Sequence, residues 1–402
     1  MAPTSRLEFA MAISKWLSLL ALAPVLSLAA DTAAPPALAD FVAHCDAQGR
    51  TVWKVSLCAP VVVVAQDGTV QWTSTTPPSA PLPSTRANTS VDWGGSKWVM
   101  LLAPLPTSDA ELRRLVYHES FHVHQGALGL PDNMAVAAHL ESQQARVSIR
   151  LEWSELEQAL ASTGDARKRA IERALAYRAQ RLTDATARSD ERAQMRHEGL
   201  AEYTGTVLSG DAAALAIDSL KHANERPSFA RSFAYVSGPA WGLLLDALVP
   251  DWKAQLAAKP DADLPDLMPL KPATLPRVLI RGAIEREEAS RAYRRKQLVD
   301  DATQRTSEAN GLHLPLAKIQ LDFDPNRVVP MPDGSQVYDK ITLTSDWGTI
   351  AVDGAPLRIV KEWNAAYVPW PLPGEMTLKL ADGWSAQRGA DGRMIVGKKE
   401  SP

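Results

Sequence analysis

The sequence has little cysteine, little excess charge and few long apolar runs. Its 402 residues include only two cysteines, Cys45 and Cys58, without the spacing of metal ligands, so no cysteine-based zinc site is expected. Lysine and arginine number 43 against 46 aspartate and glutamate, a net charge of −3, and no long basic run occurs. This balance argues against nucleic acid as a partner. Beyond the N-terminus, no segment is apolar enough to span a bilayer.

The N-terminus has the pattern of a secretion signal. Lys15 precedes an apolar run over residues 16–26, and small residues follow at Ala29 and Ala30. The run is too short for a spanning helix, although an uncleaved anchor is the alternative. We therefore expect residues 1–30 to be a signal peptide and the mature chain to be exported, periplasmic or extracellular in a bacterium, with no membrane span.

The start of the mature chain fits an exported protein. Residues 31–40 are expected to be a flexible leader. In an oxidising compartment, Cys45 and Cys58 would pair and close a small loop. Two buried free thiols are the alternative.

The pattern along the chain predicts an α+β fold. Alternating segments around an Asp-Gly turn predict N-terminal strands within 41–105, whose edge could hold an extended peptide. Apolar residues at helical spacing dominate 108–308. Asp-Gly turns between short alternating segments predict a small β domain over 311–402. We expect a mainly helical domain over 31–310, with edge strands at its start, followed by the β domain.

The strongest local pattern follows a capping box formed by Ser108 and Glu111, which predicts the start of a helix. Within that helix, His118, Glu119 and His122 form the motif H-E-x-x-H. Histidines four residues apart share one helix face, so their ring nitrogens can converge on one ion. Zinc bound in this way keeps an open position for water, and the adjacent glutamate can take the water's proton.

A catalytic zinc ion needs a third protein ligand. A metzincin would have glycine and histidine where this chain has Gln125 and Leu128, which excludes that class. A second helix offers Glu198 and Glu202 on one face. We expect the first to bind the metal and the second to accept a hydrogen bond from a motif histidine, while Gly199 lets the two ligand helices approach closely. The alternative is two carboxylates on a solvated helix face.

H-E-x-x-H followed by E-G-L-A-E-Y resembles the gluzincin group of zinc metallopeptidases, which includes thermolysin-like enzymes and zinc aminopeptidases. The resemblance covers about 108–250. It implies that Glu198 is the third zinc ligand and Glu202 the acid behind it. The chain departs from the group's patterns, with Glu202 where one has aspartate and His197 where the other has asparagine. The long spacer between His122 and Glu198 suggests that two helices are inserted.

The resemblance also implies a role for Tyr235, which matches a tyrosine that stabilises the oxyanion in zinc aminopeptidases. A buried structural tyrosine is the alternative. Together these residues predict a zinc-dependent hydrolase with one Zn²⁺ per chain. It would cleave amide bonds of a peptide or protein substrate, with Glu119 as general base.

Two alternatives remain at this stage. A non-catalytic scaffold could bind a peptide, glycan or cell-envelope partner, using aromatic residues of the β domain. The candidate residues are Trp347, Trp363, Trp370 and Trp384. Zinc could also be structural, although such a site needs four ligands and no base.

Overall fold

The computed structural model describes residues 34–130, 133, 135–226, 228–275, 279–323, 327–331 and 333–399. The expected signal peptide, residues 1–30, lies outside this part of the chain. Helices and two mixed sheets give the α+β class that the sequence predicts. No helix in the described part is long and apolar enough to cross a membrane.

The chain enters the fold with a helix, not with the expected leader and strands. Helix α1 spans Pro36–Trp53, so the leader prediction is wrong from residue 36 and the strand prediction is wrong up to residue 53. Pro36 suits the first turn, where its missing N–H is not needed. Leu38, Phe41 and Cys45 recur at helical spacing and are buried, which accounts for the helix.

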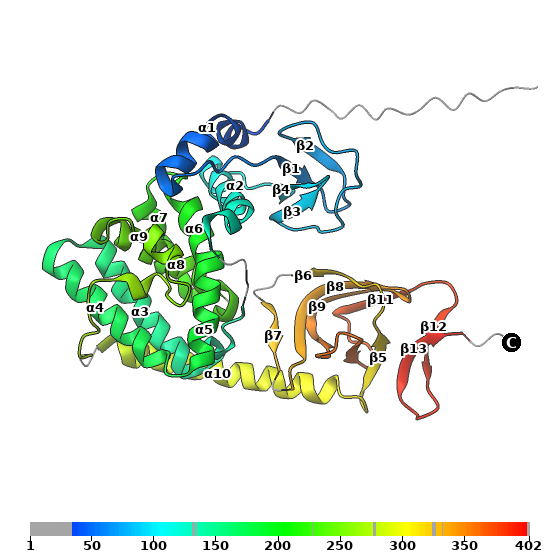
Figure 1. Ribbon diagram of the computed structural model, residues 1–402. Coiled ribbons are helices and arrows are strands. Elements are labelled where there is room, and N and C mark those ends of the chain that lie inside the picture. Colours follow the sequence, from blue (N-terminus) through cyan, green and yellow to red (C-terminus); the bar gives the residue numbers. More distant parts are fainter. Residues whose placement is uncertain are drawn as a thin grey trace, which may run out of the picture. The chain divides into compact units, whose positions relative to one another are not determined.

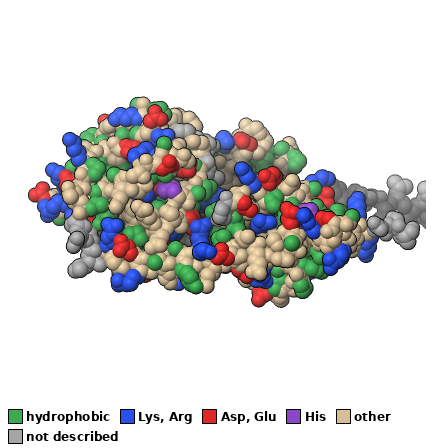
Figure 2. Space-filling model, turned by 90° about the horizontal axis from the view of Figure 1, so that it is seen from below, with side chains coloured by type: hydrophobic (Ala, Val, Ile, Leu, Met, Phe, Trp, Pro, Cys, Tyr) green, Lys and Arg blue, Asp and Glu red, His purple; other side chains and the backbone are tan. Residues whose placement is uncertain are grey.

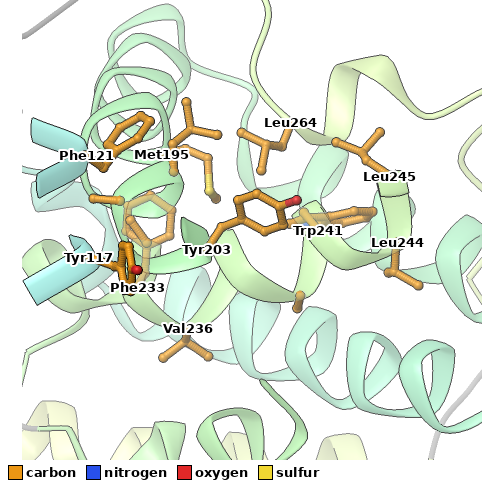
Figure 3. Close-up of a cluster of buried hydrophobic side chains, with 14 of the residues drawn as sticks. Tyr117, Phe121, Met195, Tyr203, Phe233, Val236, Trp241, Leu244, Leu245 and Leu264 are labelled. Atoms are coloured by element: carbon orange, nitrogen blue, oxygen red, sulfur yellow. The ribbon is translucent and has the colours of Figure 1, made fainter. Parts of the chain in front are cut away.

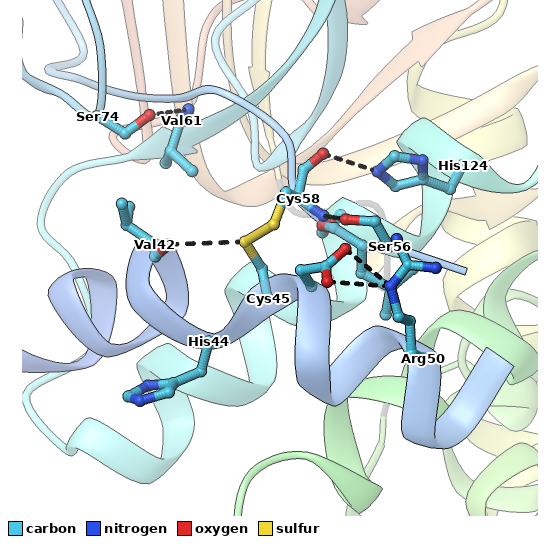
Figure 4. Close-up of a disulfide and its surroundings, with 12 residues drawn as sticks. Val42, His44, Cys45, Arg50, Ser56, Cys58, Val61, Ser74 and His124 are labelled. Atoms are coloured by element: carbon cyan, nitrogen blue, oxygen red, sulfur yellow. Dashed lines mark hydrogen bonds and ion pairs between the residues drawn. A yellow bond between two sulfur atoms is a disulfide. The ribbon is translucent and has the colours of Figure 1, made fainter. Parts of the chain in front are cut away.

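The two cysteines form a disulfide, as predicted, and it fastens α1 to the segment before the first strand. The Cα atoms of Cys45 and Cys58 lie 4.9 Å apart. Figure 4 shows the bond beside His124, which contacts the Cys58 carbonyl oxygen at 3.0 Å. The disulfide therefore lies next to the end of the following helix, α2 (Asp109–His124).

A four-stranded sheet follows the disulfide (Figure 1). Its strands are β1 (Val61–Val64), β2 (Val70–Thr73), β3 (Thr89–Trp93) and β4 (Ser96–Leu102), in the order β2-β1-β4-β3. Strands β1 and β4 are parallel, and the other pairs are antiparallel. Along β1, Val61 and Val63 join the helical core, whereas Val62 and Val64 join a second apolar cluster on the opposite face. The sheet is therefore buried on both faces at this strand.

The central part of the chain is helical. Besides α1 and α2, its helices are α3 (Gln143–Ala161), α4 (Gly164–Arg181), α5 (Ala185–Gln194), α6 (Leu200–Val207), α7 (Ala212–Lys221), α8 (Phe229–Leu248), α9 (Trp252–Ala257) and α10 (Leu279–Arg305). Short 3₁₀ turns lie at Gly126–Leu128, Ala138–Glu141, Ala223–Glu225 and Pro265–Leu267. A π turn, η3 (Met195–Gly199), joins α5 directly to α6.

The helical core surrounds α6, and Figure 3 shows its large side chains. Phe121 of α2, Met195 of the π turn and Tyr203 of α6 are all buried in it. Phe233 and Trp241 of α8 are buried in the same cluster. Burial of this size fixes α2, α6 and α8 against one another, because large apolar side chains stabilise a core by roughly 1.5–3 kcal/mol each.

Glycines set how closely these helices cross. A Cβ at Gly205 of α6 would clash with the backbone oxygen of Arg114 in α2. A Cβ at Gly238 of α8 would clash with the backbone of Gly199. Gly199 therefore allows close approach to α8 and not, as predicted, to the motif helix α2. Gly205 is the residue that brings α6 to α2.

The C-terminal segment forms the second sheet. Its strands are β5 (Gly311–Pro315), β6 (Gln320–Phe323), β7 (Val329–Pro330), β8 (Gln336–Ser345), β9 (Gly348–Ile359), β10 (Ala365–Pro369), β11 (Met376–Leu380), β12 (Trp384–Arg388) and β13 (Met394–Lys398). The main order is β12-β13-β5-β10-β9-β8-β6, with β11 on β9 and β7 on β8. Strands β13 and β5 are parallel. Leu314, Trp347 and Leu357 contribute to an apolar core separate from the helical one.

A buried charge network joins α3, α4 and α5. Glu191 of α5 is fully buried and accepts hydrogen bonds from Arg178 at 2.9 Å, from Arg181 at 2.7 Å and from His139 at 2.9 Å. Arg181 also pairs with Glu152 at 2.7 Å. Burial raises the pKa of Glu191, but Arg181, His139 and Arg178 lower it more, so it lies far below its usual range. The network fixes α5 just before the π turn.

We expect Glu191→Gln to lower the free energy of unfolding by about 3–5 kcal/mol, because it leaves two buried arginines without their shared counter-charge. The matched control is Glu362→Gln at an exposed position, which should change stability little. Urea denaturation at pH 7 measures both. Because the pKa of Glu191 is lowered from 4.5, its contribution is fully present above about pH 5 and decreases progressively as pH falls below that value. A constant difference between wild type and Glu191→Gln from pH 7 to pH 3 would contradict this assignment.

Candidate metal centre

Helix α2 presents the H-E-x-x-H residues from inside the core. The Ser108 hydroxyl accepts a hydrogen bond from the Glu111 backbone N–H at 3.4 Å, so the helix begins where the capping box predicts. His118 is 5% exposed and Glu119 is 6% exposed, whereas His122 is partly exposed. The first two residues of the motif are therefore buried, and the third is partly accessible to solvent. On the face of the molecule drawn in Figure 2, a histidine side chain is visible at the surface (purple).

Three side chains converge on one point. His118 Nε2 lies 3.2 Å from His122 Nε2 and 3.3 Å from Glu198 Oε2, and His122 Nε2 lies 3.6 Å from that same oxygen. A tetrahedral ion with ligand bonds of about 2.0–2.1 Å holds neighbouring ligand atoms about 3.3 Å apart. The triangle has the size that zinc requires. No other group of three or more His, Cys, Asp or Glu side chains in the described part of the chain converges in this way.

A buried carboxylate oxygen at this point fits a bound cation. Glu198 Oε2 is inaccessible to water and has no well-directed hydrogen bond. A buried carboxylate oxygen without a donor is costly unless a positive charge compensates it. Two imidazole nitrogens and one carboxylate are also the donor set of many catalytic zinc sites. The residues present therefore fit the ion.

The outer ring nitrogens of both histidines are held in place. His118 Nδ1 lies 2.9 Å from Glu202 Oε2, and His122 Nδ1 lies 3.1 Å from Gln125 Oε1. If Nδ1 carries the hydrogen and donates it, each Nε2 presents a lone pair to the centre. Arg114 reaches the other oxygen of Glu202 at 3.3 Å. Gln125 was not expected here, although its position three residues after His122 places it on the same helix face.

The π turn positions Glu198. The backbone N–H of Leu200 bonds to the carbonyl of Met195, five residues back, so η3 contains one residue more than an α-helical turn. This wider turn changes the direction of Glu198 relative to α5, while α6 continues and places Glu202 one turn later. Such turns occur frequently at functional sites. Sequence spacing alone does not reveal this one, because its residues look like part of a continuous helix.

Two more side chains border the centre. The ring of Tyr235, from α8, stacks on the His118 ring with centroids 5.5 Å apart and planes within 5°. Burial and the nearby Glu198, to which its side chain is hydrogen-bonded, raise the pKa of Tyr235 far above its usual value, so the phenol keeps its proton. The ring of His197 lies 4.4 Å from that of His122. The expected site residue Tyr235 is thus adjacent to the triad, and His197 was not anticipated in this position.

Glu119 lies among charges of both signs. Burial raises its pKa, the charges of His118 and His122 lower it, and the net shift is upward. A carboxylate with a raised pKa is a better proton acceptor near neutral pH than an ordinary glutamate. This makes Glu119 a candidate general base.

Other polar residues near the motif have different partners. His124 contacts the Cys58 carbonyl oxygen, His139 pairs with Glu191, and Glu141 accepts a hydrogen bond from Ser228 at 2.5 Å. None of these three belongs to the convergent group. The centre is therefore made by α2, the π turn and α8.

Comparisons with protein-family models, with curated proteins and with solved structures find no match.

Metal uptake should release a proton. Burial lowers the pKa of His118, but the nearby carboxylates of Glu198, Glu202 and Glu119 raise it more, to about 10. The metal-free centre is thus protonated at neutral pH, and a cation must displace that proton. We expect the apparent zinc affinity to rise about tenfold per pH unit between pH 6 and 8.5, measured with a competing chelator. An affinity that is independent of pH over this range would contradict the protonated state.

Proposed function

We propose that the protein is an exported zinc-dependent hydrolase, a gluzincin-like metallopeptidase that cleaves amide bonds of peptides or proteins. The observation that supports this most is the 3.2–3.6 Å triangle of His118, His122 and Glu198 with Glu119 beside it. The Cys45–Cys58 disulfide supports the exported part of the proposal, because such bonds persist in oxidising compartments.

His118, His122 and Glu198 would hold one zinc ion. Zinc in a three-ligand site supplies Lewis acidity and lowers the pKa of a water molecule in its open position. Glu202 and Gln125 keep the histidine rings oriented through the outer nitrogens. The ligand atoms are thus already in place for an ion, which would supply a nucleophilic water at neutral pH.

The remaining steps belong to the chain's own side chains. The Glu119 carboxylate takes a proton from the water as its oxygen attacks the amide carbonyl carbon. It then gives this proton to the leaving nitrogen as the C–N bond breaks. The hydroxyl of Tyr235 donates a hydrogen bond to the carbonyl oxygen as negative charge develops there. Its raised pKa keeps that hydroxyl protonated for this purpose.

The metal part of the proposal is tested by zinc content. We expect about one zinc per purified chain, lost in both His122→Ala and Glu198→Ala, because each removes one of three ligands. His124→Ala is the matched control, since it lies on the same helix but contacts the Cys58 carbonyl oxygen instead. Zinc that remains at wild-type occupancy in both ligand variants would refute the assigned triad.

The catalytic part is tested by variants that keep the metal. Glu119→Gln should retain zinc and reduce peptide hydrolysis about 10²–10⁴-fold, because it removes the proton acceptor. Tyr235→Phe should lower kcat about 10²–10³-fold with KM nearly unchanged, since its hydroxyl acts mainly in the transition state. Hydrolysis of a peptide library provides the measurement. The controls are Glu111→Gln and Tyr293→Phe at exposed positions. Full activity of Glu119→Gln with zinc bound would exclude the mechanism.

The alternative function is a scaffold that binds a peptide, glycan or cell-envelope partner without cleaving it. Such a scaffold would use the exposed aromatic side chains of the β domain. Trp363 is 39% exposed and Trp370 is 37% exposed, whereas Trp347 is buried and packs in the sheet core. Peptide or glycan binding that requires the two exposed tryptophans, together with no turnover by the zinc-loaded protein, would favour this function.

A further inference from the structure

A pocket apart from the metal centre is lined by arginines. It has a volume of about 580 Å³ and lies between α3, α10 and the start of the second sheet. None of His118, His122 and Glu198 lines it. Five arginines and three carboxylates do, which leaves an excess of two positive charges. The arginines are Arg146, Arg291, Arg294, Arg295 and Arg327.

Arg146 is the key residue of this pocket because its side chain is buried and only one of its three nitrogens has a hydrogen-bond acceptor. Its side chain is 3% exposed, and its Nε donates to Glu288 at 2.6 Å. Its guanidinium carbon lies 3.4 Å from the centroid of the Phe229 ring, so one flat face is covered. The two terminal nitrogens, Nη1 and Nη2, have no hydrogen-bond acceptor. The group is therefore held rigidly with an unused pair of donors.

The carboxylates of the pocket are already engaged. Glu288 is shared by Arg146, Arg150 and Arg291, at 2.6, 2.8 and 3.6 Å. Asp339 pairs with Arg327 at 2.8 Å. Neither carboxylate accepts a hydrogen bond from the terminal nitrogens of Arg146. Because leaving two buried donors without an acceptor is unfavourable, these nitrogens favour an acceptor supplied from outside the protein.

The remaining acid and one exposed arginine complete the lining. Glu141 accepts a hydrogen bond from Ser228 and lies 3.6 Å from Arg295. Arg294 is exposed and donates to Ser290 at 2.7 Å. It can therefore turn toward a ligand at the mouth of the pocket. A fixed guanidinium edge inside and an exposed cation at the entrance would together favour an anion.

We propose that this pocket binds a small molecule through a carboxylate or phosphate group placed against the terminal nitrogens of Arg146. Two parallel N–H donors match two oxygens of either group, and the bond is charge-assisted. The pocket volume lies within the range of small-molecule sites. The proposal does not depend on the hydrolase function, since the pocket and the metal centre have no triad residue in common.

Calorimetric titration of the full zinc-loaded chain with inorganic phosphate and, separately, with succinate tests the proposal. We expect one anion per chain, bound more weakly as salt increases. Arg146→Gln should weaken binding at least about tenfold, and Arg294→Ala about two- to fivefold. Arg286→Ala, an exposed arginine of α10 that does not line the pocket, should leave the affinity unchanged. The anion that binds more tightly identifies the group that the pocket prefers.

Two further measurements keep the outcomes distinct. Binding should persist in His122→Ala, which separates this pocket from any anion held at the metal centre. If Arg146→Gln does not fold, as judged by thermal denaturation, the charge reversal Arg294→Glu decides, with an expected weakening of more than about fivefold. The proposal is overturned if neither anion binds wild type up to about 50 mM. It is also overturned if folded Arg146→Gln, or Arg294→Glu in its place, binds as wild type does.

Discussion

The candidate metal centre depends on how closely the helices cross. Helix α6 packs closely against α2, and the π turn packs closely against α8. Gly205 lets α6 approach the backbone of α2, and Gly199 meets Gly238 of α8. A methyl group at Gly205 or Gly238 would push these helices apart. Because His118 and His122 come from α2 and Glu198 from the π turn, any such separation would widen the triangle. The 3.2–3.6 Å spacing is therefore a consequence of helix packing as much as of the motif.

The buried charge network also fixes the position of the segment that carries Glu198. Arg178, Arg181 and Glu191 are held by one another, and further contacts come from His139, Glu152 and Asp263. Buried ion pairs contribute little net stability relative to apolar packing, but they impose a geometry that few alternative arrangements can satisfy. This network lies just before the segment that carries Glu198. It limits how α5 can rotate and so limits the direction in which the π turn presents its carboxylate.

Much of the site was predictable because it depends on spacing along a helix. His118 and His122, and likewise Glu198 and Glu202, are four residues apart, so each pair shares a face whatever the tertiary structure. The change of periodicity along the chain predicted the α+β class. The disulfide was predicted because the chain has only two cysteines and was expected to be exported.

The rest depends on contacts between distant segments. Local sequence patterns do not encode the packing that produces three of these features. They are the π turn, the contact of Gly199 with α8 and the hydrogen bond between His122 and Gln125. Helix α1 was missed because its alanines and proline resemble a leader, and only burial of Leu38 and Phe41 shows otherwise. The unused donors of Arg146 could not be foreseen either. Its neighbours Phe229 and Glu288 lie far away in the sequence.

The loop closed by the disulfide has a consequence for assembly. Its Leu57 and Cys58 carbonyls accept hydrogen bonds from Ser120 and His124, which flank His122 on α2. Formation of the cystine and docking of α2 are therefore thermodynamically linked. Whatever favours the bond favours the docked helix, and a correctly docked helix in turn brings the two thiols within reach of each other. Oxidation of the two cysteines and assembly of the centre are therefore coupled equilibria.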